Sequence, residues 1–350
     1  MALSLGACSI QATKENPHEG ASTPKAENLK PIGKPIQPPQ ALGLPPVPVP
    51  EDNPITEETV KLGQVLFFTT KLSKDGTISC ATCHNPAKGF ADPNPGSRGM
   101  GGQTGDRNAP SAQFAAYSPT QFWDGRAATL EEQALGPIAN PIEMGHTLEA
   151  MEITLKDDAQ LTELFQKAFG APPSKAGVAK AIAAFERMLP RGNSAFDKFQ
   201  YGKDDKALSA SAKRGLDIFK DPKKGNCAVC HTIESQYAIF ADGKFHNLGV
   251  GMDENGELKD LGRYKVTKND ADRGAFKTPT LRNIALTAPY MHDGSQRTLK
   301  EVVDFYVGGG NSNPNLDKEI KPLTALSKQD REDLVAFLES LTSERTPDKQ

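Results

Sequence analysis

The amino-acid sequence predicts a mainly α-helical protein built from two similar units. The five-residue pattern Cys-x-x-Cys-His occurs twice, at residues 80–84 and 227–231. A stretch with the apolar spacing of an amphipathic helix lies shortly before each copy. Few segments alternate polar and apolar residues in the manner of a strand. We therefore expect an internal duplication of a small helical unit.

Residues 1–54 are expected to lie outside the two units. Proline is concentrated between Pro31 and Pro54, which excludes a helix and favours an extended tether of polyproline type. Cys8 follows Leu5-Gly6-Ala7, a sequence similar to the lipid-attachment site of bacterial lipoproteins, although only seven residues precede it. We expect a lipid anchor at Cys8 joined to the folded body by the tether. The alternative is a free cysteine in a disordered tail.

The first folded unit is predicted to span residues 55–203. Thr56-Glu57-Glu58 is a helix-start signal, and the apolar positions that follow it lead towards the first Cys-x-x-Cys-His copy. The glycine-rich residues 96–105 predict a loop. Helical periodicity returns over residues 148–169 and 175–188.

The second folded unit is predicted to span residues 204–345 and repeats the same order. A helix over residues 210–219 leads into the second Cys-x-x-Cys-His copy. The polar residues 253–273 are expected to form a loop, and residues 299–306 and 328–341 to form closing helices.

Composition limits the classes of protein to consider. The 350 residues are enough for two domains, and 37% hydrophobic with 24% charged residues is typical of a soluble globular protein. The net charge of −3 and the lack of a long basic run argue against a nucleic-acid partner. No apolar run reaches the roughly 20 residues that are needed to span a bilayer.

The repeated Cys-x-x-Cys-His pattern is the attachment signal of c-type haem. Cys80 and Cys83 would form thioethers with one haem and Cys227 and Cys230 with another, so we predict two covalently bound haem c groups. The histidine after each pair, His84 or His231, would be an axial iron ligand. A zinc site, a thioredoxin-like pair or two disulfides are alternatives, but none of them requires a histidine after each pair. Covalent haem attachment also implies an exported bacterial protein, and we expect a periplasmic location.

Over residues 55–342 the chain resembles the bacterial dihaem cytochrome c peroxidases, a family that includes the MauG-type enzymes. The resemblance rests on Leu66-Phe67-Phe68, Leu72-Ser73, Ser79 to His84, Phe122-Trp123-Asp124-Gly125-Arg126, Asn140-Pro141-Ile142-Glu143-Met144, Leu248-Gly249, Thr278-Pro279-Thr280-Leu281-Arg282-Asn283 and Ala288-Pro289-Tyr290-Met291-His292-Asp293-Gly294. It implies two cytochrome c-like domains, of which one haem receives electrons and the other reacts with hydrogen peroxide.

The resemblance implies roles for three residues near the first haem. Glu143 matches the family's acid–base residue, and Gln133 matches a glutamine beside it. Trp123 matches a tryptophan that lies between the two haems. Without the resemblance, Glu143 would be assigned to the surface and Trp123 to the core.

Two positions depart from the pattern of the conventional peroxidases. Met100 stands where many members have a histidine that binds the first iron at rest, so the iron is either open at rest or weakly bound by Met100. Tyr306 stands where the sixth ligand of the second haem is usually methionine, which resembles MauG. Met291 is an alternative ligand there, and His292 is expected to hydrogen-bond a propionate. Met100 without a role and Tyr306 as a core residue remain alternatives.

The family also holds a calcium ion between its domains. Asn108, Thr287 and Pro289 match the positions that supply its amide and carbonyl oxygens, which suit a hard cation. His146 and His246 are expected to be surface or core residues without a metal.

Three functions fit these residues. The first is a peroxidase that reduces hydrogen peroxide to water with electrons from a small cytochrome c or cupredoxin. The second is a MauG-like enzyme that uses peroxide to oxidise tryptophan or tyrosine residues of a protein partner. The third is a pure electron carrier. A homodimer is expected because many family peroxidases form one.

Overall fold

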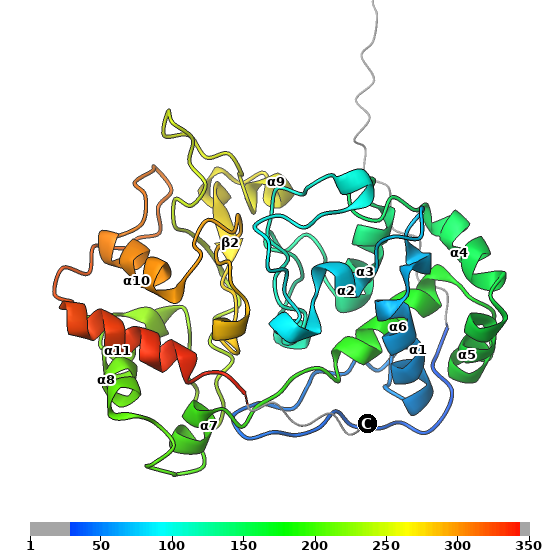
Figure 1. The fold of residues 1–350 in the computed structure, drawn as a ribbon, viewed down its shortest axis with the longest axis horizontal. Helices are drawn as coiled ribbons and strands as arrows, with labels where there is room; N and C mark the ends of the chain where they lie inside the picture. Colours follow the sequence, from blue (N-terminus) through cyan, green and yellow to red (C-terminus); the bar gives the residue numbers. More distant parts are fainter. Residues whose placement is uncertain (1–28, 344–350) are drawn as a thin grey trace, which may run out of the picture.

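The structure, a computed structural model, describes residues 29–343 as two helical lobes that lie side by side (Figure 1). The helices of the first lobe are α1 (Glu57–Phe68), α2 (Cys80–Cys83), α3 (Leu130–Ala139), α4 (Leu148–Lys156), α5 (Ala159–Phe169) and α6 (Lys175–Glu186). Those of the second lobe are α7 (Ala195–Gln200), α8 (Ala210–Lys220), α9 (Tyr264–Thr267), α10 (Leu299–Gly308) and α11 (Lys328–Glu339). The prediction of a mainly α fold is confirmed.

Hydroxyl and carboxylate side chains start most of these helices. Thr56 accepts a hydrogen bond from the backbone of Thr59 before α1, and Ser209 accepts one from Ala212 before α8. Each such cap satisfies a backbone N–H that has no partner inside the helix and contributes about 1 kcal/mol. The stretch 148–169, expected as one helical region, is two helices, because Asp158 caps the N-terminus of α5 and so restarts the helix.

The same helix crossing recurs in both lobes. In the first lobe α1 lies against α6 at Gly63, where a Cβ atom would stand 1.9 Å from the carbonyl oxygen of Ala181. In the second lobe α8 lies against α11 at Gly215, where a Cβ atom would stand 2.0 Å from the carbonyl oxygen of Asp333. In each pair, the backbone of one helix therefore lies directly against a glycine of the other helix, as expected of duplicated units.

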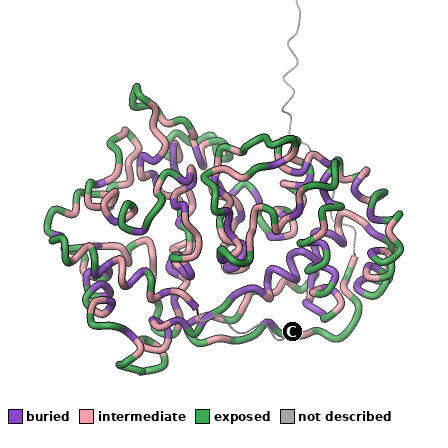
Figure 2. The backbone as a smooth tube through the Cα atoms, viewed as in Figure 1, coloured by how far each residue is buried: buried purple, intermediate pink, exposed green. Residues whose placement is uncertain are grey.

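Each lobe has its own apolar core, seen as the buried stretches in Figure 2. The first core is formed mainly by residues of α1, α3, α4, α5 and α6, among them Leu62, Leu66, Phe67, Ile138, Met151, Phe165, Val178 and Ile182. The second includes Leu216, Phe219, Phe240, Val303, Leu334 and Phe337. Phe196 of α7 also belongs to the second core, so this core begins before residue 204.

Strands are few among the described residues. β1 (Phe245–Asn247) and β2 (Ala275–Lys277) form one antiparallel pair, with His246 opposite Phe276. The segment 253–273 between them is largely loop, as expected, but contains the short helix α9. The pair lies on the side of the second lobe that faces the first lobe (Figure 1).

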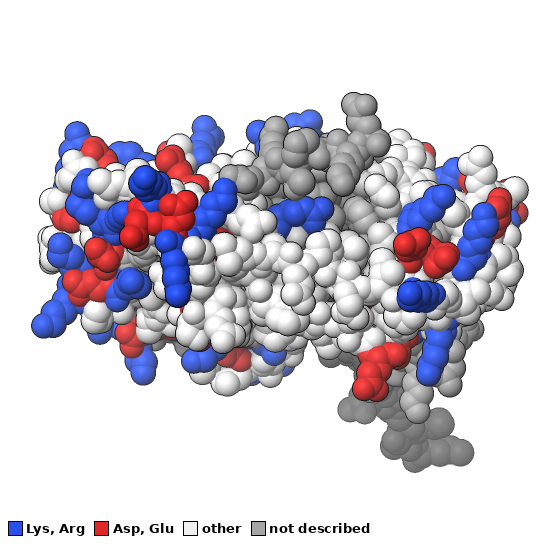
Figure 3. All heavy atoms as spheres, turned by 90° about the horizontal axis from the view of Figure 1, so that it is seen from below, with Lys and Arg blue, Asp and Glu red and all other residues white. Residues whose placement is uncertain are grey.

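Residues 29–54, which we call the strap, are extended, run beneath the first lobe and reach the near edge of the second lobe (Figure 1). The sequence suggested a tether, but the strap is packed against the folded body. Lys180 donates hydrogen bonds to the carbonyl oxygens of Leu29 and Asp52. The hydroxyl of Tyr117 donates a hydrogen bond to the carbonyl oxygen of Pro45. The face seen in Figure 3 has its charged side chains mainly towards its two ends. Cys8 lies outside the described residues.

Within residues 29–343, none of the helices combines the length and apolar character that crossing a membrane requires.

We predict that Gly215→Ala destabilises the protein, because the new methyl group would overlap the backbone of α11. Overpacking of this kind costs about 1–3 kcal/mol. Urea unfolding followed by far-UV circular dichroism measures the change. Gly308→Ala in α10 is the control, because no atom lies within 4 Å of its added Cβ and alanine favours helix over glycine. Equal loss of stability in the two variants would contradict the prediction.

Candidate haem sites and active site

The first haem motif forms one short helix. Cys80–Cys83 make up α2, and Ser79 and Thr82 form reciprocal capping hydrogen bonds at its start. The backbone N–H of His84 donates to the carbonyl oxygen of Cys80 at 2.8 Å, so the histidine closes the same turn. Both thiols and the imidazole therefore come from one compact segment, as attachment to one porphyrin requires.

Both motif histidines are oriented by a backbone carbonyl. Nδ1 of His84 lies 3.1 Å from the carbonyl oxygen of Phe90, and Nδ1 of His231 lies 2.8 Å from that of Phe240. A carbonyl can only accept, so Nδ1 carries the proton and Nε2 is left to bind a metal. Burial lowers the pKa of both histidines, which favours the neutral imidazole that binds iron.

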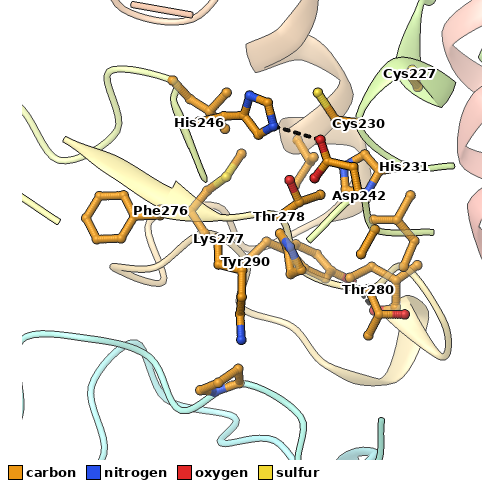
Figure 4. Close-up of a pocket in the computed structure, with 18 of the residues that line it drawn as sticks. Cys227, Cys230, His231, Asp242, His246, Phe276, Lys277, Thr278, Thr280 and Tyr290 are labelled. Carbon is orange, nitrogen blue, oxygen red and sulfur yellow. Dashed lines mark hydrogen bonds and ion pairs between the residues drawn. The ribbon is translucent and has the colours of Figure 1, made fainter. Parts of the chain in front are cut away.

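A cavity of about 590 Å³ adjoins the second motif (Figure 4). Cys227, Cys230 and His231 lie on its wall together with apolar and aromatic side chains that include Phe219, Val250, Phe276, Leu299, Val303 and Leu338. The hydroxyl of Thr278 is buried on this wall. An apolar cavity with a thiol pair, a histidine and a buried hydroxyl fits a haem with its polar propionates.

Tyr306 reaches this cavity from α10, so the residue predicted as a sixth ligand lines the same cavity as His231. Burial, and then the two motif cysteines, raise the pKa of Tyr306 above its usual range. Met291 and His292 line the same cavity. The structure therefore brings each candidate from the sequence to the second haem site, and the choice of ligand stays a prediction.

Glu143 acts electrostatically on the first motif. Burial first, and then the charges of Asp92 and Glu143, raise the pKa of Cys83 to about 11. Burial raises the pKa of Glu143 itself, and the positive charge of Arg126 opposes the rise. Gln133 is half-buried in α3, the helix that ends just before the Glu143 turn.

The glycine-rich loop is held against the Glu143 turn. The backbone N–H of Met100 donates to the carbonyl oxygen of Glu143 at 3.0 Å. A Cβ atom on Gly99 would stand 1.9 Å from the carbonyl oxygen of Ile142, and one on Gly145 would stand 2.6 Å from the Met100 sulfur. Met100 therefore packs on the turn that carries Glu143, and its role as an iron ligand stays a prediction.

Trp123 lies at the contact between the lobes. Its indole N–H donates to the carbonyl oxygen of Asn108 at 2.9 Å, and its own carbonyl oxygen accepts from the backbone N–H of Lys277 at 2.8 Å. Its ring is edge-on to that of His292, with centroids 6.5 Å apart. His292 in turn stacks on Phe276, with centroids 3.6 Å apart. The side chain predicted to lie between the haems thus joins an aromatic group of the second lobe.

Charged side chains hold the lobes together around Trp123. Arg107 donates to Asp124 at 2.7 Å in its own lobe and to Asp260 of the other lobe at 2.6 and 3.1 Å. Arg263 donates to the carbonyl oxygens of Asp124 and Gly125. Because Asp124 is the neighbour of Trp123, these bonds fix the tryptophan relative to the second lobe.

The Lys277 side chain also crosses from β2 to the first lobe, towards which it points in Figure 4. Its ammonium group donates to the hydroxyl of Ser118 at 2.6 Å and to the carbonyl oxygen of Thr120. Burial lowers the pKa of Lys277 to about 8.

Trp123 and His292 occupy matching positions in the two repeats. The residues before them, Phe122 and Met291, both have positive φ. The glycines two residues after Trp123 and His292, Gly125 and Gly294, also have positive φ. Isolated bridges enclose the two turns, Gln121 with Ala127 and Tyr290 with Gln296. The sequence analysis assigned His292 a propionate contact and missed its contact with Trp123. The signal was present in the similarity of Phe-Trp-Asp-Gly to Met-His-Asp-Gly.

Asn108, Thr287 and Pro289, the three residues matched to a calcium site, all line the cavity. Asn108 is buried, and its backbone N–H donates to the carbonyl oxygen of His292 at 2.7 Å. The structure therefore brings together residues from both lobes that are far apart in the sequence.

His246 has charged partners that the sequence analysis did not identify. Its Nδ1 lies 2.5 Å from Asp317 and its Nε2 lies 3.0 Å from Asp242. The contact with Asp242 is drawn in Figure 4, next to Cys230. These carboxylates orient the imidazole beside the second motif.

Two family models match the chain. The model described as di-haem cytochrome c peroxidase matches residues 57–206, and that described as cytochrome c matches residues 212–342. These matches confirm the prediction of two cytochrome c-like domains.

Similar curated proteins carry two different names. The methylamine utilization protein MauG of Methylorubrum extorquens is 41% identical over 302 residues, which cover 85% of this chain and 82% of that protein. The cytochrome c551 peroxidase of Pseudomonas aeruginosa is 40% identical over 310 residues, covering 85% and 84%. Among solved structures, a MauG-like protein associated with microbial copper homeostasis is 34% identical, with a TM-score of 0.78 over 86% of this chain and 94% of that one.

We predict that the double variant Cys227→Ser, Cys230→Ser carries one covalent haem instead of two, because serine cannot form a thioether. The mass of the denatured protein should fall by one haem relative to the parent. The matched variant Cys80→Ser, Cys83→Ser should lose the other. Retention of two covalent haems in either variant would contradict the assignment.

Proposed function

The chain belongs to the dihaem cytochrome c peroxidase family, and on this basis we propose that it reduces hydrogen peroxide to water with electrons from a small redox protein. The reaction consumes two electrons and two protons for each peroxide and yields two waters. The observation that carries this proposal is the half-buried Glu143, whose charge acts on Cys83 of the first haem motif and whose turn is bonded to the Met100 loop.

A haem held by Cys80, Cys83 and His84 would supply the iron at which the O–O bond is cleaved. The chain supplies the proton transfer. The Glu143 carboxylate accepts the proton from one peroxide oxygen and returns it to the departing oxygen, which leaves as water. Gln133 supplies amide donors for holding the peroxide. Arg126 keeps part of the Glu143 population ionised by opposing the effect of burial on its pKa.

Trp123 is proposed to carry electrons from the second haem towards the first. Its ring lies at the lobe contact, and its N–H is held by Asn108 while its carbonyl is held by Lys277. These bonds come from both sides of the contact, so the indole has one fixed orientation at the contact between the lobes.

Tyr306 favours a second candidate function. A phenolate on the second iron would stabilise the ferric and higher oxidation states, because it is a hard anionic ligand. Such a protein would store oxidising equivalents and use them on tryptophan or tyrosine residues of a protein partner, as proposed for a MauG-like enzyme. The position of Tyr306 on the cavity wall with His231 supports this reading.

Other features remain proposals of the same kind. We propose a calcium ion at Asn108, Thr287 and Pro289, supported by their shared cavity wall. The donor is proposed to be a small cytochrome c or cupredoxin. An exported, periplasmic location is proposed from covalent haem attachment, a lipid anchor from the lipoprotein-like residues before Cys8, and a homodimer from the family resemblance. Each stays a prediction.

We predict that Glu143→Gln lowers kcat/KM for peroxide by about 10²–10⁴-fold, because the amide cannot accept the proton. The parent should lose activity as the pH falls through the raised pKa of Glu143, because only the ionised form accepts a proton. Steady-state peroxide reduction with a reduced cytochrome c over a range of pH measures both effects. In Glu143→Gln, this fall in activity at low pH should be absent. Glu132→Gln, on the exposed side of α3, is the control. An unchanged rate in Glu143→Gln would remove the proposed role.

The two candidate functions make different predictions for Tyr306→Met. If Tyr306 binds the second iron, the oxidised parent should react with peroxide at once and form a long-lived oxidised state that the variant lacks. Optical and EPR spectra during a peroxide titration detect this state. A parent that is inert until half-reduced, and then turns over with a cytochrome donor, would instead be a conventional peroxidase and would refute the Tyr306 assignment.

A further inference from the structure

The strap reaches the second lobe at one turn, residues 41–44, which we call the strap turn. Leu42 and Asn193 exchange hydrogen bonds, with the backbone N–H of Asn193 donating to the carbonyl of Leu42 at 3.1 Å and the Asn193 side chain accepting from Leu42 at 3.2 Å. On either side of this turn the strap contacts the first lobe, for example at Ile32 and Pro45. The strap turn is therefore the part of the strap that makes specific contacts with the second lobe.

Gly43 is the centre of this contact. Its φ is +83°, and a Cβ atom there would stand 1.8 Å from a carboxylate oxygen of Asp197. Its carbonyl oxygen accepts from the backbone N–H of Ala238 at 3.1 Å and from the guanidinium of Arg282. Both the conformation and the close approach require glycine at this position.

The Gly43 carbonyl completes the surroundings of a buried charge. Arg282 is 1% exposed and Asp197 is fully buried, and their guanidinium and carboxylate groups form two hydrogen bonds of 3.0 and 2.9 Å. The Nε atom of Arg282 donates to the carbonyl oxygen of Ala238. A buried arginine that loses an acceptor carries a desolvation cost, so the strap turn is coupled to the position of Arg282 and of Ala238.

Residues 238–240 connect this contact to the second haem motif. At one end, Ala238 is bonded to both Gly43 and Arg282. In the middle, the hydroxyl of Thr280 donates to the carbonyl oxygen of Ile239 at 2.6 Å. At the other end, the Phe240 carbonyl oxygen accepts from Nδ1 of His231 at 2.8 Å. The segment that orients His231 is thus held in place by the strap.

We propose that the strap turn is a positioning element for His231, so that the properties of the second haem depend on a segment outside both haem domains. The inference rests on His231 as an axial ligand of that haem. It extends the proposed function, because it assigns the strap a part in setting the electron-accepting site.

The direction of the effect follows from the hydrogen bond to Phe240. Donation from Nδ1 to a carbonyl makes the imidazole a more basic ligand, which favours the ferric state. If the segment 238–240 moves and this bond weakens, the ferrous state becomes more stable relative to the ferric state. The reduction potential of the second haem then rises, while that of the first haem does not change.

The test compares Gly43→Ala with the parent in the full holoprotein. We expect the ratio of reduced to oxidised second haem at a fixed potential to rise about tenfold, which equals about 59 mV for a one-electron couple. Spectroelectrochemical titration and EPR of each haem measure this effect. Gly33→Ala is the matched control, because Gly33 lies in the strap with φ +111° but its added Cβ would meet only the flexible end of Glu58.

Asn193→Gly is a milder second variant. It keeps the positive φ at this position and removes only the side-chain bond to Leu42, so we expect a smaller shift in the same direction. If Gly43→Ala does not fold, this variant decides the question. An unchanged second haem in the variants that fold, or an equal shift in Gly33→Ala, would overturn the proposal. The readout does not use peroxide, so its outcome is independent of whether the peroxidase activity is correct.

Discussion

The two lobes must keep one relative position for the site to exist. Trp123 belongs to the first lobe, yet the second lobe provides the backbone N–H that binds its carbonyl and the His292 ring that its indole contacts. Arg107 fixes the same contact through a fork of hydrogen bonds to Asp260. Charged groups at a half-buried contact tolerate little movement, because separation would leave them without partners in a poorly solvated place. The geometry between the two haem sites therefore depends on this contact more than on either core.

Local chemistry made much of this protein readable from its sequence. The spacing of Cys80, Cys83 and His84 dictates attachment to one porphyrin, whatever surrounds it. The helices followed from apolar periodicity and from caps such as Thr56 and Ser209. The duplication followed from the repeated motif, and the shared helix crossing at Gly63 and Gly215 agrees with it. These features depend on residues that are near one another along the chain.

Features that depend on distant residues were not readable in the same way. Arg107 and Asp260 are 153 residues apart in the sequence, and no local pattern links them. The proline-rich strap looked like a spacer because its packing is made through backbone carbonyls, such as that of Pro45, which leave no signature in side-chain type. Glu143 and Gln133 could be nominated only through the resemblance to a family, since an isolated glutamate has no distinctive context. Residues that act through tertiary contact become visible only when the fold brings them together.

The matching positions of Trp123 and His292 show how a repeated backbone can carry a directional process. Both side chains extend from turns of the same shape, enclosed by equivalent bridges, and the two turns face each other. A perfectly symmetric pair would give electrons no preferred sense of travel. Here an indole stands on one side and an imidazole on the other, so the two rings differ although the turns that carry them match. A duplicated gene could therefore acquire polarity between its halves through side-chain substitution, while the scaffold that sets their separation stays the same.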